Sequence, residues 1–324
     1  MKLVLAVFAA LALAPVSSDT LAFGPKEGTK LEKSFHQHIT LEKRAMTMSL
    51  GERDLPAELT EKAVFDLEFE TKVDVVDEYE AVDGGRPTRL ARTYASLADS
   101  ETTRIQMVGM AELKEEKKEK ESALEKKTVV FRWNGEKERY DKAWRGDEGD
   151  EELLKGVEED MDLRALLPTK SIAKGDTWKV DLGDAKELFG PGGKFAFKVK
   201  DEEKDKDKDS SFEDNLKGEV ECTYEGEKEV DGKKLARVAL ACKATTKMAP
   251  SEDDGALQSM DFEFDLEGEL LWDAAARHFV SYELGGDVTT KLVIQRKVEA
   301  KGQQHDFTIR LELGGKLELE GKAE

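Results

Sequence analysis

Apolar and charged residues alternate along several stretches of the chain. Between residues 260 and 272 every second residue is apolar, most residues between them are acidic, and the alternation breaks only at Gly268. The same alternation returns at residues 65–75 and 307–319. Successive side chains of a β-strand point to opposite faces, so each stretch predicts an antiparallel strand with one buried face and one face in water.

These strands predict a mainly β fold. We expect a large curved antiparallel sheet, half-barrel or sandwich-like, with one or two short helices. The helical signals are residues 150–167, which carry apolar residues at helical spacing and end before Pro168, and a turn or two at residues 184–189. Gly314-Gly315 divides the last alternating stretch and predicts a terminal hairpin there.

The start of the chain has the features of a secretory signal peptide. Lys2 is followed by a short apolar run from Leu3 to Ala14 and then by small residues. We expect residues 1–18 to be removed and residues 19–324 to form a single β-rich domain. The apolar run is shorter than the roughly 20 residues that span a bilayer, and no later stretch is long enough. The mature protein is therefore expected to be exported, periplasmic or secreted, and without a membrane span.

Two short segments of the domain repeat one pattern. Val82-Asp83-Gly84 and Val230-Asp231-Gly232 each follow an acidic strand, and each precedes a Leu-Ala-Arg sequence. Both segments are expected to be hairpin turns that contain glycine. Duplication of a half-domain, with related halves at about 19–165 and 166–324, is one explanation. Independent use of a common hairpin turn is the other, and the sequence favours neither.

The high content of charged residues is compatible with a folded β domain. The chain has 71 acidic and 51 basic residues and a net charge of -20, yet 39% of its 324 residues are hydrophobic, which is enough for a core. A net anion is a poor partner for nucleic acid or anionic lipid. Much of the acidity falls on the wet faces of the alternating strands. Residues 112–127 and 201–211 are expected to be charged loops, the first alternatively a solvated helix or a long hairpin extension.

The only two cysteines, Cys222 and Cys242, lie on the apolar faces of two consecutive strands. In a hairpin folded about Gly232 they would face each other directly, close enough for a disulfide. An exported protein favours the oxidised pair, and two reduced, buried thiols are the alternative. A redox role is not expected, because the sequence has no CxxC spacing and an apolar setting raises the pKa of a thiol.

Motifs that mark catalytic or metal sites are absent from the sequence. It contains no GxSxG, no HExxH and no phosphate-binding loop. His36 and His38 share a strand face without a third ligand nearby, and residues 205–209 lack the glycine and glutamate that complete a calcium loop. We therefore expect a protein that is not an enzyme, with no catalytic residue, no cofactor, no metal site and no nucleic-acid partner.

The segment 163–182, LRALLPTKSIAKGDTWKVDL, is the most distinctive part of the sequence. A helix is expected to end at Pro168, the chain to turn at Lys174-Gly175-Asp176, and a strand with Trp178 facing inward to follow. The segment resembles a motif of uncharacterised exported β-rich bacterial proteins, many from planctomycete-type genomes. Those proteins also have a Trp-Asp or Phe-Asp turn after a strand that contains glycine, as at Leu271-Trp272-Asp273 here. The resemblance covers about half of the chain and implies a structural corner, and it carries over no catalytic residue.

The apolar face of the predicted sheet is the candidate functional surface, because two helices are too few to cover it. The first hypothesis is an exported, non-catalytic binding protein of the cell envelope whose curved sheet holds an apolar ligand or a segment of an envelope protein. The candidate ligand-facing residues are Phe69, Trp178, Phe262, Phe264 and Trp272. The alternative for each is that it belongs to the core. A structural or interaction module whose acidic sheet face binds a basic partner or cations is the second hypothesis, and an uncharacterised hydrolase is the third.

Overall fold

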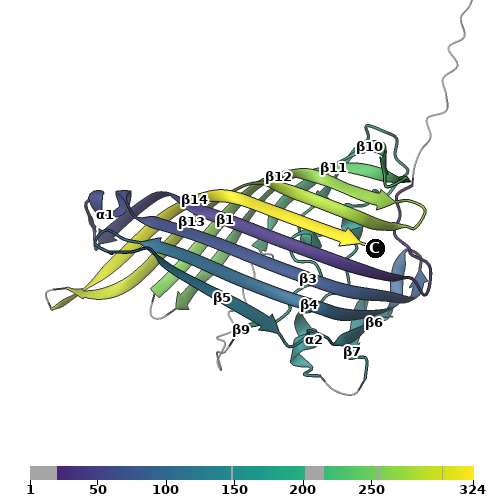
Figure 1. Cartoon of the computed structure of the whole chain (residues 1–324), viewed down its shortest axis with the longest axis horizontal. Coiled ribbons are helices and arrows are strands. Elements are labelled where there is room, and N and C mark those ends of the chain that lie inside the picture. The colour runs from purple at the N-terminus through teal and green to yellow at the C-terminus, as the bar shows by residue number, and fades with distance from the viewer. Residues whose placement is uncertain (1–19, 147–148, 201–214, 254–255, 301) are drawn as a thin grey trace, which may run out of the picture.

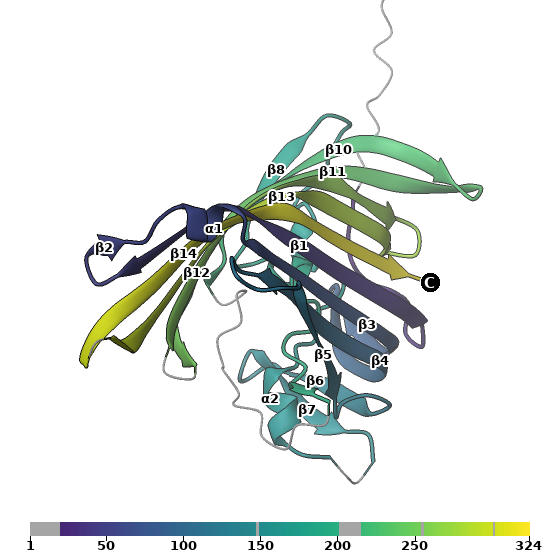
Figure 2. The same ribbon diagram turned by 60° about the vertical axis from the view of Figure 1, so that its left-hand side comes forward.

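The computed structural model describes residues 20–146, 149–200, 215–253, 256–300 and 302–324. These residues form one antiparallel sheet of 14 strands that is strongly curved and does not close on itself (Figures 1 and 2). Two short α-helices accompany the sheet in the described residues. The predicted fold class, mainly β with a large curved antiparallel sheet and one or two short helices, is confirmed.

The long strands lie side by side across the molecule (Figure 1). The elements are β1 (Lys30–Leu50), β2 (Arg53–Asp54), α1 (Glu58–Glu61), β3 (Val64–Asp83), β4 (Arg86–Gln106), β5 (Lys114–Ser122), β6 (Thr128–Asn134), β7 (Arg139–Trp144), α2 (Glu152–Gly156), η1 (Arg164–Leu166), β8 (Thr177–Asp181), η2 (Lys186–Leu188), β9 (Phe197–Val199), β10 (Lys217–Val230), β11 (Lys233–Asp253), β12 (Ala256–Asp273), β13 (His278–Ala300) and β14 (Gln303–Ala323). The order in the sheet is β7-β6-β4-β3-β1-β14-β13-β12-β11-β10-β8. β2 pairs with β1, and β5 pairs with β4 and β9. No helix in the described part of the chain is long and apolar enough to span a membrane.

The alternating stretches of sequence form the two faces of this sheet. On β14, Leu317 and Leu319 are buried, whereas Glu318 and Glu320, which alternate with them, are exposed. The apolar positions of β3 and β12 likewise point to the concave side, which we call the inner face, and most of them are buried there (Figure 2). The acidic positions point to the convex side, the outer face. Period-two patterning therefore determines which side of each strand faces the core.

The predicted terminal hairpin at Gly314-Gly315 is wrong, because β14 runs through both glycines without a turn. A Cβ atom on Gly315 would lie 1.7 Å from the carbonyl oxygen of Thr40 on the neighbouring strand. Gly268 of β12 shows the same close approach, 1.9 Å from the carbonyl oxygen of Glu283. These glycines are required where strand backbones come too close for any side chain, rather than where the chain turns.

The predicted helix over residues 150–167 is also wrong over most of its length. Only α2 and the single 3-10 turn η1 are helical, with irregular chain between them. Val157 forms a β-bridge with Gly193, and Leu163 has the left-handed φ of 54°, which interrupts a right-handed helix. Non-helical chain packed on the sheet therefore carries apolar residues at spacings similar to those of a helix. Over so short a run, periodicity alone does not distinguish the two.

The charged segment 112–127 is mostly a strand and not a loop. β5 pairs with β4 along its whole length and with β9 at its end. Cross-strand ion pairs neutralise its charges, with Arg104 2.7 Å from Glu115 and Lys120 2.8 Å from Asp99. The alternative of a long hairpin extension describes this segment. The expected signal peptide at residues 1–18 and the expected charged loop at residues 201–211 lie outside the described residues.

The two halves of the domain occupy separate halves of the sheet. β1, β3, β4, β6 and β7 form one side, and β8 with β10 to β14 form the other. The first half proceeds from the centre outward and the second from the edge inward. The two repeated turns are both tight two-residue loops with positive φ angles, Gly84-Gly85 in one and Asp231-Gly232 in the other. Such turns are the favoured hairpin connections.

Residues 149–196, interrupted by β8, pack against the inner face, and we call them the crossing segment (Figure 2). The buried apolar residues that it contributes to the core are Leu154, Val157, Met161, Leu163, Leu166, Ile172, Leu182, Ala185, Leu188, Phe189 and Phe195. They form one cluster with apolar side chains from the long strands. Much of the inner face is therefore covered by irregular chain rather than by helices.

Candidate functional site

Burial on the inner face decreases steadily along the strands. On β12, Trp272 is fully buried, Phe264 is 4% exposed, Phe262 is 8% exposed and Met260 is only partly buried. The buried residues lie near the crossing segment, and Met260 lies toward α1. We call these two regions the packed end and the open end of the inner face.

The same gradient recurs on neighbouring strands. On β14, Leu317 is fully buried, whereas Ile309 and Phe307 are only partly buried. The partly buried apolar side chains at the open end are Phe65, Phe69, Met260, Ile294, Phe307 and Ile309. They come from β3, β12, β13 and β14, so the open end is built by both halves of the sheet. Apolar side chains from four strands therefore retain contact with solvent at this end.

Two of the five predicted ligand-facing residues belong to the packed end. Trp272 has no exposed surface and is a core residue, so it does not face a ligand in this structure. Trp178 lies on the edge strand β8, and its indole Nε1 donates a hydrogen bond to the carbonyl oxygen of Leu166 at 2.9 Å. Trp178 therefore fastens the crossing segment to the sheet edge.

The other three predicted residues lie at or beyond the place where the crossing segment stops covering the inner face. The rings of Phe262 and Phe264 stack with their centroids 5.8 Å apart and an interplanar angle of 6°. Phe189 of the crossing segment packs against Phe264, also at 5.8 Å between centroids. Phe69 lies on β3, in the other half of the sheet, where it pairs with Ile39 of β1. Phe262 and Phe69 thus belong to the open end, and Phe264 marks the boundary.

The segment around Trp178 contains a turn that leads into β8. Gly175 has the positive φ of 94° that its turn requires, and its amide donates to the carbonyl oxygen of Tyr224 at 2.7 Å. Asp176 accepts a hydrogen bond from the amide of Ala173 at 2.9 Å. The turn therefore directs the chain from the crossing segment into β8, which is a structural task.

A charged cluster lies inside the packed end. Lys33 Nζ is 2.8 Å from Asp77 Oδ2 and 2.5 Å from Asp162 Oδ1, and it donates to the hydroxyl of Tyr79 at 2.7 Å. Arg92 donates two hydrogen bonds to Asp77, at 2.7 and 2.8 Å. The side chains of Lys33, Asp77 and Arg92 have no exposed surface. A substrate has no access to these groups, so the cluster is structural rather than catalytic.

The cluster joins the crossing segment to the sheet. Lys33, Asp77 and Arg92 come from β1, β3 and β4, whereas Asp162 comes from the crossing segment. Arg92 also donates to the carbonyl oxygens of residues 158 and 159, at 2.9 and 2.8 Å. These bonds hold backbone that has no partner in a helix or sheet.

Electrostatic pairing keeps Asp77 ionised within this cluster. Burial alone would raise the pKa of Asp77, but Arg92 and Lys33 outweigh burial and hold the pKa at about 2. Sequence reasoning missed the cluster, although a signal was present. Lys33, Asp77 and Arg92 each occupy an apolar position of an alternating strand, and a charge at such a position indicates a buried partner.

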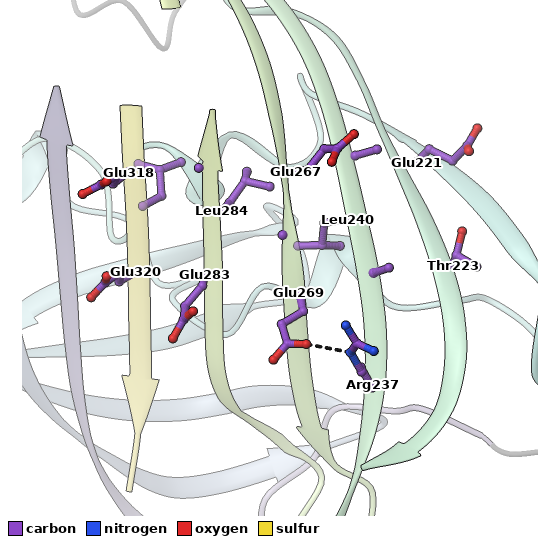
Figure 3. Close-up of a pocket in the computed structure, with 15 residues that line it drawn as sticks. Glu221, Thr223, Arg237, Leu240, Glu267, Glu269, Glu283, Leu284, Glu318 and Glu320 are labelled. Atoms are coloured by element: carbon purple, nitrogen blue, oxygen red, sulfur yellow. Dashed lines mark hydrogen bonds and ion pairs between the residues drawn. The ribbon is translucent and has the colours of Figure 1, made fainter. Parts of the chain in front are cut away.

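The outer face carries a shallow groove of about 600 Å³ over β10 to β14 (Figure 3). Six glutamates line it: Glu221, Glu267, Glu269, Glu283, Glu318 and Glu320. Arg237 pairs with Glu269 at 2.6 Å. Alanines and glycines, among them Ala239 and Gly285, form its floor. The groove is therefore acidic and lies above small residues of the strands.

Three of these glutamates face one another across neighbouring strands. Glu283 of β13 is directly opposite Glu269 of β12 on one side and Glu320 of β14 on the other. Within the described residues, Glu283 and Glu320 have no hydrogen-bond or ion-pair partner. Like charges directly opposite each other destabilise a sheet, so Glu283 is in an unfavourable position between its two neighbours.

Cys222 and Cys242 are free thiols in this structure, and the predicted disulfide is not formed. Cys222 lies opposite Leu240 and Cys242 lies opposite Val220, so the cysteines are offset by two residues. The turn has two residues instead of three, and a bulge at Glu225 shifts the register again. Burial raises the pKa of both thiols to about 12, which makes them poor nucleophiles.

The two neighbouring histidines lie on the outer face. His36 is 3.1 Å from Glu70, and His38 is 3.3 Å from Glu68. The part of the chain that the structure describes contains no group of three or more His, Cys, Asp or Glu residues placed to hold a metal ion. Each histidine is accounted for by a carboxylate on the adjacent strand.

No family model and no curated protein matches the chain. Among solved structures, an outer membrane channel from Pseudomonas putida F1 is 9% identical, with a TM-score of 0.17 and coverage of 93% of this chain and 97% of that chain. OccAB4 from Acinetobacter baumannii is 8% identical, with a TM-score of 0.12 and coverage of 93% and 100%. Likenesses this weak carry no argument about this protein.

Proposed function

We propose that this chain is a non-catalytic binding protein of the cell envelope that holds an apolar ligand at the open end of its inner face. One observation carries the proposal, namely the gradual loss of cover over the apolar side chains from Trp272 to Met260 and from Leu317 to Phe307. A sheet whose inner face served only as core would be expected to bury these side chains at both ends. Assignment to the envelope is supported by the signal-peptide features of residues 1–18.

The energetics favour an apolar occupant at this end. Covering apolar surface contributes about 25 cal/mol per Å². Aromatic rings such as Phe65 and Phe69, which are partly buried, present flat surfaces to which a hydrocarbon chain or ring can attach without a hydrogen-bonding pattern. The sealed charged cluster around Asp77 supports a role in binding over one in catalysis, because its ionised groups are beyond the reach of a substrate.

Substituting Ile309 with glutamine is expected to weaken binding of the neutral apolar probe N-phenyl-1-naphthylamine at least fivefold, because a polar amide replaces open-end apolar surface. The control is Leu167→Gln, which makes the same kind of change at a partly buried residue of the crossing segment. Its probe affinity is expected to stay within twofold of the parent protein. Fluorescence titration measures both affinities, and circular dichroism checks that each variant is folded.

Native mass spectrometry and organic extraction of protein purified from its own organism provide the direct test. A bound apolar molecule that is released by organic solvent is the expected result. Protein that carries no such molecule and also fails to bind the probe would overturn the proposal. An equal loss of probe binding in Ile309→Gln and Leu167→Gln would place the ligand elsewhere.

The second candidate function is recognition of a basic partner or cation by the acidic outer groove. The specific observation behind it is the row of opposed glutamates Glu269, Glu283 and Glu320. Salt distinguishes the two candidates, because exposed charges are screened over about 10 Å at 0.1 M ionic strength. Binding at the groove should weaken steeply as salt is added, whereas apolar binding at the open end should be nearly indifferent.

A further inference from the structure

Four large hydrophobic side chains in the described part of the chain are exposed, and all four lie at one end of the molecule. They are Leu59 at 37%, Val108 at 48%, Met110 at 38% and Leu113 at 47% exposed. Leu59 belongs to α1, and the other three follow β4 in the connection to β5. Scattered single exposures are normal on a protein surface, but a concentration at one end indicates a contact surface.

The fold brings these residues together. Val64, three residues after α1, pairs with Gln106, the last residue of β4, so α1 and the β4–β5 connection are neighbours. A tight turn projects the connection, because the amide of Met110 donates to the carbonyl oxygen of Met107 at 3.0 Å and Gly109 adopts a φ of +93°. We call Leu59 together with residues 107–113 the apolar tip.

The apolar tip adjoins the open end of the inner face. Phe65, one of the partly buried residues of the open end, follows Val64 directly and pairs with Ile105 beside the tip. Figure 1 shows α1 and the adjacent ends of β3 and β4 at the same end of the sheet. Apolar surface therefore continues from the exposed tip to the inner face.

We propose that the apolar tip inserts shallowly into the surface of a lipid bilayer and thereby places the open end against the membrane. This proposal deepens the proposed function and rests on it, since a ligand held at the open end would then be exchanged with the bilayer. A few apolar side chains on a projecting turn can enter the boundary between headgroups and acyl chains without spanning the membrane.

The size of the tip favours a lipid surface over a protein partner. A standard protein interface buries about 800 Å² on each partner. Four side chains, none of them more than half exposed, cannot supply that area. A projecting turn also lacks the concave surface into which a partner segment would fit, whereas a fluid bilayer adapts to any arrangement of side chains.

Charge indicates which lipid surface the tip would meet. The tip is flanked by Lys62 and Lys114 but also by Glu58, Glu61 and Glu112, and the whole chain carries a net charge of -20. Such a surface is not attracted to anionic headgroups. We therefore infer docking on zwitterionic lipid, driven by the apolar side chains and nearly independent of salt.

Flotation of the full chain with phosphatidylcholine vesicles tests the proposal. The triple variant Val108→Ser, Met110→Ser and Leu113→Ser is expected to lower the vesicle partition coefficient at least tenfold. The control variant, Glu136→Ser with Lys137→Ser, changes the exposed β6–β7 turn at the packed end and should leave it unchanged. Absence of binding by the parent protein would overturn the proposal, as would binding that requires phosphatidylglycerol or disappears in 0.5 M salt.

A second measurement locates the contact. Met110→Trp should be quenched by brominated phosphatidylcholine, whereas Lys137→Trp should not. Equal quenching at both positions would contradict docking by the tip, and so would a parent protein that forms dimers broken by the triple variant. Titration with N-phenyl-1-naphthylamine separates the two proposals. If the parent protein binds the probe but not vesicles, docking fails and the proposed function stands; failure of probe binding removes the proposed function itself.

Discussion

Replacing Asp77 with alanine is expected to lower the free energy of unfolding by about 3–5 kcal/mol. The substitution would leave Lys33 and Arg92 fully buried with Asp162 as the remaining carboxylate in contact with Lys33. An uncompensated charge inside a protein costs several kcal/mol, because it loses its hydration without gaining an opposite charge. Equilibrium unfolding in urea at pH 7 measures the effect.

Asp74→Ala is the matched control for this experiment. Asp74 lies three residues earlier on the same strand, on the outer face, and is not fully buried. Its replacement is expected to change stability by no more than about 0.5 kcal/mol. If Asp77→Ala cost no more than Asp74→Ala, the buried pairing of Lys33 and Arg92 with Asp77 could not be what holds the crossing segment in place.

Glu187→Gln is expected to stabilise the protein at alkaline pH by about 2–4 kcal/mol. Glu187 lies in η2 and is buried, and its Oε1 has no hydrogen-bond partner among the described residues. Burial, together with the nearby charge of Asp160, raises the pKa of Glu187 from 4.5 to about 8. Glutamine has nearly the same shape but cannot ionise, so it avoids the cost of burying a charge.

The sign of the pH dependence follows from proton binding. Between pH 4.5 and about 8 the folded protein retains a proton on Glu187 that the unfolded chain has lost, so this group makes stability fall as pH rises through that range. Unfolding curves from pH 4 to pH 9 should therefore show a smaller fall for Glu187→Gln than for the parent protein. Glu152→Gln, an exposed position in α2, should retain the parental slope. Parallel curves for Glu187→Gln and the parent protein would refute the assignment.

Local patterning was sufficient to predict the strands and the faces they bury. The alternation at 65–75, 260–272 and 307–319 lies within β3, β12 and β14, with the apolar residues inward. Alternating burial follows from the geometry of a single strand with one buried face. It can therefore be predicted without knowing which strands are its neighbours. The prediction of a helix at 150–167 was wrong over most of its length. Non-helical chain packed on the inner face has much the same apolar spacing as a helix.

Features that depend on the register between strands could not be predicted from the alternation of apolar and polar residues. The offset of Cys222 from Cys242 results from a two-residue turn followed by a one-residue bulge, and neither is evident from spacing. The charged cluster requires knowledge that β1, β3 and β4 are neighbours and that the crossing segment supplies Asp162. The sequence shows only that Lys33, Asp77 and Arg92 occupy positions where the alternation predicts apolar residues.

The sequence predicted that the sheet has an apolar face, but not which part of that face other segments of the chain cover. Phe69 and Phe262 lie at the open end, whereas Trp272, with the same alternation, is fully buried. The difference arises because the crossing segment covers one end of the inner face and reaches only as far as Phe264. Strand patterning describes the sheet and contains no information about where another part of the chain will lie upon it.

The position of β14 has a consequence for how the protein is made. The last strand of the chain lies in the middle of the sheet, between β1 and β13, and the amide of Glu324 bonds to Glu32 near the start of β1. The two halves of the sheet therefore cannot join through β1 and β14 until β14 has been synthesised. Contacts between the most distant parts of a chain form slowly, and until they form the apolar sides of both halves remain uncovered. Synthesis of β14, rather than early local folding, should set the time at which this protein becomes protected from proteases and from aggregation.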